Sequence, residues 1–127
     1  MGELKIGRMV LGVCQTNCYF VYREDEPYAV VVDPADKGQN IYDALRRNGF
    51  RVAGILLTHG HFDHIWGLDG LRDAANAAAE ADGAEQVKAY AHEAERELLK
   101  DTGMNVSAQA GRACSTYADV YVKDGQE

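Results

Sequence analysis

With 127 residues, a formal net charge of −7 and an isoelectric point near 5.0, the chain is long enough for one domain at most. Its lysines and arginines are scattered among acidic residues and form no basic stripe, which argues against nucleic-acid binding. The sequence has no apolar run of about eighteen residues and its first residues lack a secretory pattern. We therefore expect a soluble cytoplasmic protein with no membrane partner.

Three strands are predicted in the first third of the chain. Spaced apolar residues at 4–13 and the run at 17–22 are compatible with strands, and residues 23–27 form an acidic turn. Residues 28–33 are nearly all β-branched or apolar, as is typical of a strand covered on both faces, and Pro34 ends it. We expect these three strands to form a meander.

The middle of the chain predicts a helix, a strand and a second helix. From Asp36 the apolar residues follow helical spacing, and Gly49 is placed to end this short helix. Residues 52–57 predict a buried strand that leads directly into a cluster of histidines. The cluster should therefore lie in a loop at the carboxyl end of a strand, where α/β folds often place chemistry. Beyond it, residues 65–78 predict an alanine-rich helix that ends near residues 82–83.

The last third predicts three shorter elements. We expect a strand at residues 86–91, a helix at 92–100 and a strand at 117–123, whereas residues 104–115 show no clear period. The alternation of strands with helices indicates an α/β fold.

The three cysteines predict no metal or redox site. Cys14, Cys18 and Cys114 are an odd number, and none of their spacings is that of a paired CxxC motif. We interpret them as small buried or half-buried thiols.

The histidine cluster is the strongest chemical signal. His59, His61, Asp63 and His64 place four potential metal ligands within six residues, and Gly60 allows the backbone to approach an ion closely. Imidazole and carboxylate ligands suit zinc and, less exclusively, iron, manganese or cobalt. If the chain alternates here, His59 and His61 point the same way, while Asp63 and His64 can reach a second ion.

A solvated surface loop that happens to be rich in histidine is the alternative. It is disfavoured because three of the four histidines in the chain fall here, directly after a buried strand. The fourth, His92, is isolated at an expected helix start, so we interpret it as a capping or surface residue rather than a ligand.

The cluster resembles the HxHxDH signature of the metallo-β-lactamase superfamily, which stands here as residues 59–64. Other stretches resemble the small glyoxalase II-like (hydroxyacylglutathione hydrolase-like) members: Asn17-Cys18-Tyr19, Asp33-Pro34, Ile55-Leu56-Leu57-Thr58 and Gly67-Leu68. The resemblance covers nearly the whole chain. It implies an αββα sandwich of which residues 1–127 supply roughly the N-terminal αβ half, truncated at the C-terminus.

The resemblance also implies a set of ligands. His59 and His61 would hold a first zinc, and Asp63 and His64 a second, with iron or manganese as alternatives to zinc. Asp33 matches an acidic position near the metal loop and could orient a ligand histidine. The alternative for Asp33 is an ordinary turn residue at a strand end.

The implied chemistry is zinc-dependent hydrolysis of a small-molecule substrate. Water shared by two ions would attack an ester, thioester or related bond, and Asp63 would orient it as the catalytic residue. A hydroxyacylglutathione-type thioester fits the glyoxalase II-like features best.

Two other functions stay open. The remaining metal ligands of the family are expected after residue 127, so the chain could be a metal-binding or interaction module without catalysis. A homo-oligomer or a complementing C-terminal half could cover the sheet face that a half-fold leaves exposed. A diiron oxidoreductase relative is disfavoured, because that branch usually has Glu where this chain has His61.

Overall fold

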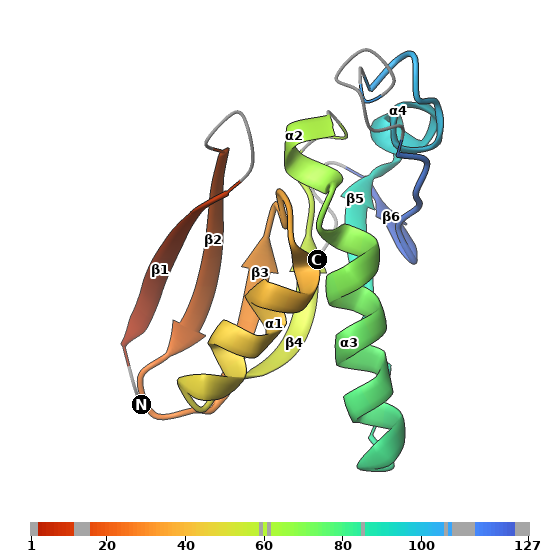
Figure 1. Ribbon diagram of the computed structural model, residues 1–127. Coiled ribbons are helices and arrows are strands. Elements are labelled where there is room, and N and C mark those ends of the chain that lie inside the picture. Colours follow the sequence, from red (N-terminus) through yellow and green to blue (C-terminus); the bar gives the residue numbers. More distant parts are fainter. Residues whose placement is uncertain are drawn as a thin grey trace.

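The fold is built on one mixed β-sheet, and the computed structural model describes residues 3–11, 16–58, 60, 62–84, 86–105, 107 and 114–123. The side chains of residues 10, 11, 62 and 63 lie outside this description. Within the described residues the sheet has six strands that are neighbours in chain order: β1 (Leu4–Leu11), β2 (Thr16–Arg23), β3 (Tyr28–Val32), β4 (Arg51–Leu56), β5 (Ala89–His92) and β6 (Val120–Val122). The predicted α/β class is confirmed (Figure 1).

The predicted meander is confirmed as well. β1 pairs with β2 in antiparallel register from Leu4 opposite Arg23 to Leu11 opposite Thr16, and β2 pairs with β3 in the same sense. From β3 to β6 all neighbouring strands are parallel. β3 ends at Val32, because the next residue leaves the extended conformation.

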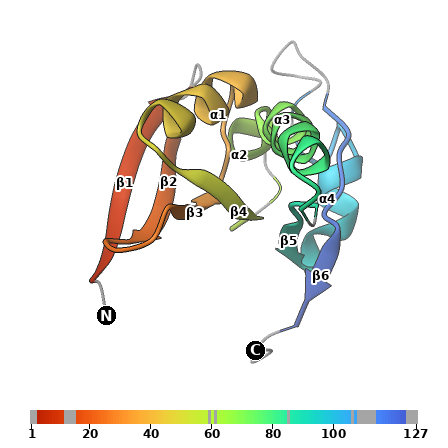
Figure 2. The same cartoon turned by 90° about the horizontal axis from the view of Figure 1, so that it is seen from below.

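Two helices lie side by side on one face of the sheet (Figures 1 and 2). They are α1 (Gly38–Arg47) and α3 (Leu68–Ala81), and both were predicted. The glycines that follow them, Gly49 and Gly83, have φ values of 83° and 68°, the left-handed conformation in which helices commonly end. None of the helices in the described residues is long and apolar enough to cross a membrane.

The elements after α3 differ from the prediction in their bounds. β5 begins at Ala89 rather than near residue 86, and β6 is only three residues long. The helix predicted over residues 92–100 is divided into the 3-10 helix η1 (Glu93–Glu95) and α4 (Arg96–Lys100).

The core lies between the sheet and the helices. Its large side chains with almost no exposure come from α1, α3, β3 and β4 and include Ile41, Leu45, Leu68, Leu71, Val31 and Ile55. Burial of each such side chain contributes roughly 1.5–3 kcal/mol. Ile65 and Leu99 extend the same core to the carboxyl edge of the parallel strands.

The other face of the sheet is exposed in the described part of the chain. Tyr19 of β2 is paired with Val32 of β3, which is paired with Leu56 of β4, so these side chains form an apolar row across the sheet. Leu56 is 43% exposed, and Leu4 and Ile6 of β1 are 67% and 68% exposed on the same face. We call the side chains of Leu4, Ile6, Tyr19, Val32 and Leu56 the open face.

The prediction that residues 28–33 are covered on both faces is wrong for this structure. Ala29 and Val31 are fully buried, but Tyr28 is 52% exposed and Val30 and Val32 are only half-buried. The reason is that α1 and α3 both lie on one face, and the described residues place no element on the other.

Candidate metal site

Three neighbouring strands bring polar side chains to one edge of the sheet. Asp33 follows β3, Thr58 follows β4, and His92 ends β5. These strands are parallel, so their carboxyl ends meet at the edge where open α/β sheets place ligand sites. The predicted strand before the histidine cluster is confirmed, since β4 ends at Leu56, but it is buried on one face only.

Asp33 contacts both Thr58 and His64 at this edge of the sheet. Its carboxylate accepts two hydrogen bonds from Thr58, one from the amide nitrogen to Oδ1 at 2.8 Å and one from the hydroxyl to Oδ2 at 2.5 Å. Oδ2 also lies 2.9 Å from Nδ1 of His64. Asp33 is 4% exposed, so it is a buried carboxylate, and within the described residues its side-chain hydrogen bonds go to Thr58 and His64 of the segment 58–64, which we call the histidine loop.

The backbone of Asp33 is held in an uncommon conformation. Its φ is 55°, in the left-handed region that few residues other than glycine, asparagine and aspartate adopt. The Asp33 amide donates to the carbonyl oxygen of Leu56 at 2.9 Å, which ties this turn to the end of β4. Such strained positions, fixed by several hydrogen bonds, cluster at functional sites.

The contact with Asp33 selects a tautomer of His64. A carboxylate accepts hydrogen bonds, so this contact favours the neutral tautomer of His64 that has its proton on Nδ1 and its lone pair on Nε2. Metal-ligating histidines in proteins commonly donate their second ring N–H to a carboxylate in this way. The His64 side chain is 20% exposed. Its environment therefore fits a metal ligand. The structure shows the contact between Asp33 and a histidine of the cluster, and the role of Asp33 in orienting a metal ligand stays a prediction.

The rest of the predicted ligand set is placed only in part. His64 and Asp63 lie in the four-residue helix α2 (Phe62–Ile65), so the prediction that the whole cluster is a loop is wrong at these two positions. His59, His61 and the side chain of Asp63 are outside the described residues, and their roles stay predictions. Among the side chains that are described, no three His, Cys, Asp or Glu residues form a metal-binding group.

A second carboxylate contacts the histidine loop at Gly60. The amide of Gly60 donates to Oε1 of Glu95 at 3.0 Å. Sequence reasoning assigned no role to Glu95 or to the Thr58 hydroxyl. Thr58 had a local signal, since it directly precedes the cluster, whereas Glu95 is 35 positions away from Gly60 and had none.

The prediction that His92 is a capping or surface residue is confirmed. His92 is exposed, and its Nδ1 accepts a hydrogen bond from the amide of Ala94 at 3.0 Å, which starts η1. This bond places the imidazole in a structural role at the beginning of a helix.

The thiols behave as predicted where they are described. Cys18 is fully buried, and burial, together with the negative charge of Asp33, raises the pKa of its thiol to about 12. Cys114 is half-buried, neither thiol is in a disulfide, and Cys14 is outside the described residues. Cys18 is therefore a neutral core side chain beneath the site.

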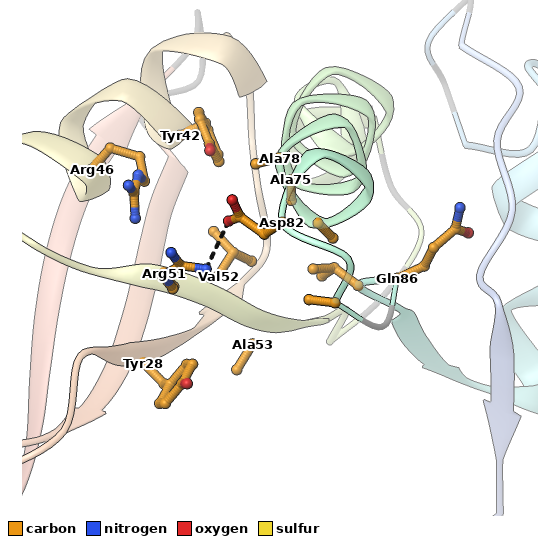
Figure 3. A pocket seen from close by; sticks show the side chains of 13 residues that line it. Tyr28, Tyr42, Arg46, Arg51, Val52, Ala53, Ala75, Ala78, Asp82 and Gln86 are labelled. Carbon is orange, nitrogen blue, oxygen red and sulfur yellow. Dashed lines mark hydrogen bonds and ion pairs between the residues drawn. The ribbon is translucent and has the colours of Figure 1, made fainter.

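A separate cavity lies at the other end of the parallel strands (Figure 3). It has a volume of about 260 Å³ and is bounded by α1, α3 and the start of β4. Tyr42 and Arg46 of α1 line it, and Arg51 crosses it to pair with Asp82 at 2.9 Å. Its described lining contains no histidine or cysteine, and we do not count it as part of the metal site.

The chain is similar to known proteins over most of its length. Residues 11–125 match the family described as the metallo-beta-lactamase superfamily. A curated relative, the "Probable metallo-hydrolase YqgX" of Bacillus subtilis, is 33% identical over 104 residues, which are 82% of this chain and 44% of that protein. A hydroxyacylglutathione hydrolase of Albidiferax ferrireducens is 42% identical over 62 residues, 49% of this chain and 24% of that protein.

Solved structures show the same relation. The crystal structure of BLEG-1 B3 metallo-beta-lactamase superposes with a TM-score of 0.80 at 32% identity, covering 94% of this chain and 54% of that chain. TTHA1623 in a di-iron-bound form gives a TM-score of 0.68 at 27% identity, covering 95% and 56%. This chain thus spans about half the length of these structures, and less than half of the two curated relatives.

Proposed function

Because this chain belongs to the metallo-beta-lactamase superfamily, we propose that it supplies part of a metal-dependent hydrolytic site that acts on a small molecule. The observation that carries the proposal is the 2.9 Å contact between Asp33 and Nδ1 of His64 at the carboxyl edge of the parallel strands. A buried carboxylate next to a histidine of an HxHxDH signature supports metal binding, because it favours the tautomer of that histidine whose free nitrogen can bind a metal ion.

The proposed ligands are those of the signature. His59 and His61 would hold one ion, and Asp63 and His64 a second. We propose zinc, because His61 adds an imidazole to a set of nitrogen and carboxylate ligands that suits this metal. The relative TTHA1623 was solved with two irons, so iron is the competing metal for this set.

The chemistry follows from this set of residues. Bound metal ions supply an acidified water and neutralise charge that develops on the substrate oxygen. This chain would contribute Asp63 as the carboxylate that orients the attacking water, and Asp33 with Thr58 as the groups that keep His64 in its binding tautomer. The substrate we propose is a thioester of the hydroxyacylglutathione type, supported by the partial 42% identity to a hydroxyacylglutathione hydrolase.

A binding function without catalysis is the second candidate. The observation behind it is the open face, where Leu4, Ile6 and Leu56 are exposed in the described part of the chain. In this form the open face would pack against a complementing C-terminal half or a second copy, because exposed apolar rows of this kind favour association.

The test combines metal binding with turnover. Zinc binding would be measured for the wild type, His61→Ala and the control His92→Ala, and the same proteins would be assayed with a panel of thioesters and esters. We expect His61→Ala to lose most of its zinc affinity and any turnover, and His92→Ala to keep both. Zinc binding without turnover would support the second candidate, whereas equal losses in both variants would reject the ligand assignment.

A further inference from the structure

We propose that Glu95 is a positioning residue, whose carboxylate holds the backbone amide between His59 and His61 in place for metal binding. The inference rests on the proposed metal site, but the contact at its centre can be tested in metal-free protein. It assigns a role to an acidic residue that is not part of the ligand signature.

The first observation is the hydrogen bond itself. Oε1 of the half-buried Glu95 accepts from the amide of Gly60 at 3.0 Å, and Gly60 is buried. A carboxylate is a stronger acceptor for a backbone amide than a neutral oxygen. The residue it holds stands between two predicted ligands, so a shift of this amide would move the backbone on which both imidazoles are carried.

The second observation is the packing of Gly60 against α4, the helix that directly follows η1. A Cβ added to Gly60 would lie 3.2 Å from Cγ and Cδ2 of Leu99 and 3.3 Å from its backbone nitrogen. Leu99 is fully buried in α4, so it has little freedom to withdraw. One polar contact from Glu95 and one apolar contact from Leu99 therefore fix the position of Gly60.

The segment that presents Glu95 is η1 followed by α4, and it is anchored through Leu99. The carbonyl of Leu99 accepts from the amide of Thr116 at 3.0 Å and from Nδ2 of the buried Asn105 at 3.3 Å. Glu95 is therefore carried by a segment that is itself held in place by hydrogen bonds. A residue that sets the geometry of another segment needs such support.

The two carboxylates contact different residues of the histidine loop. Asp33 holds Thr58 and His64, and Glu95 holds Gly60 between them. Since accurate ligand placement depends on the groups that support the ligands, loss of either carboxylate should weaken metal binding while the fold remains.

The experiment compares Glu95→Ala with Glu95→Gln, which keeps a side-chain carbonyl able to accept the Gly60 amide. Glu97→Ala is the matched control, because Glu97 lies in α4 of the same segment and pairs at the surface with Lys100 at 3.2 Å. Amide hydrogen exchange at Gly60 would be measured by NMR in metal-free protein. Cobalt or zinc affinity would be measured for the same four proteins.

We expect Glu95→Ala to speed Gly60 exchange and to lower metal affinity by about tenfold, the lower end of what loss of a group supporting a ligand costs. Glu95→Gln should recover most of both losses, because its neutral carbonyl accepts the same amide somewhat more weakly, and Glu97→Ala should change neither value.

Unchanged Gly60 exchange in Glu95→Ala would overturn the contact, and faster exchange with unchanged metal affinity would overturn the positioning role. If Glu95→Gln behaves like Glu95→Ala, the charge rather than the hydrogen bond is required and the proposal is wrong. If the wild type binds no metal, the proposed function fails and the positioning role fails with it. The exchange data would then still show whether Glu95 holds the loop.

Discussion

Replacement of Asp33 by asparagine should convert His64 to the wrong tautomer. Asparagine has one carbonyl oxygen and one NH₂ group, whereas Asp33 accepts at both oxygens. If the asparagine oxygen keeps the Thr58 amide, its NH₂ faces Nδ1 of His64. That nitrogen must then accept, which moves the imidazole proton to Nε2 and removes the lone pair that a metal would use.

The size of this effect can be estimated from the contact. Loss of a carboxylate that supports a metal-ligating histidine weakens metal binding by about 10- to 100-fold, or roughly 1.4–2.7 kcal/mol. Asparagine tolerates the φ of 55° at this position, so Asp33→Asn leaves the backbone conformation accessible, whereas a bulky or β-branched residue would not. The loss should therefore appear in metal affinity more than in folding.

The assay is zinc affinity by competition with a chromophoric chelator, with unfolding by urea measured on the same samples. The control is Asp43→Asn in α1, which removes the same charge from an exposed residue whose carboxylate accepts a hydrogen bond from Gln39. Wild-type zinc affinity in a folded Asp33→Asn protein would refute the reasoning about the tautomer.

Three further predictions concern stability and association. Arg72 is 4% exposed, its guanidinium lies 3.9 Å from the centre of the Tyr117 ring, and it donates a hydrogen bond to the Tyr117 carbonyl. Arg72→Met removes these contacts and should lower the free energy of unfolding, measured by urea titration, by about 2–3 kcal/mol. A change below about 0.5 kcal/mol would contradict this prediction. Because the pKa of the Cys18 thiol is raised from 9.0 to about 12 by folding, between these two pH values the thiol ionises in the unfolded protein but not in the folded one. The contribution of the neutral thiol to the free energy of unfolding is therefore complete below pH 9 and is lost as the pH rises towards 12. By pH 10.5 the wild type should lose about 2 kcal/mol relative to Cys18→Ala, and a difference that does not vary with pH would refute the assignment. Ile6→Lys with Leu56→Lys should reduce any self-association seen by light scattering at micromolar concentration, and an unchanged mass in an associating protein would place the interface elsewhere.

The local pattern of the sequence predicted the helices and the meander because each has its own periodic signal. The spacing of Ile41 and Leu45 in α1, and of Leu71 and Ala75 in α3, corresponds to side chains that are buried in the structure. The four-residue helix α2 was missed, since one turn is too short to show a period.

Burial and long-range contacts could be predicted only in part. The apolar runs at 28–33 and 52–57 indicate buried strands, but they do not say which elements cover each face, and Tyr28 and Leu56 are exposed in the structure. Asp33 was a candidate because it ends a strand near the cluster. Glu95 could not be found in the same way, because its hydrogen bond to Gly60 depends on how β5 and η1 are placed beside β4.

Metal content tests the central claim most directly. Protein purified without chelator would be analysed for zinc, iron and manganese per chain, together with its mass in solution, for the wild type, His64→Ala and His92→Ala. The account predicts bound metal in the wild type, chiefly zinc, a clear loss in His64→Ala and no loss in His92→Ala. Absence of metal from the wild type even after incubation with zinc, or equal metal content in all three proteins, would contradict it.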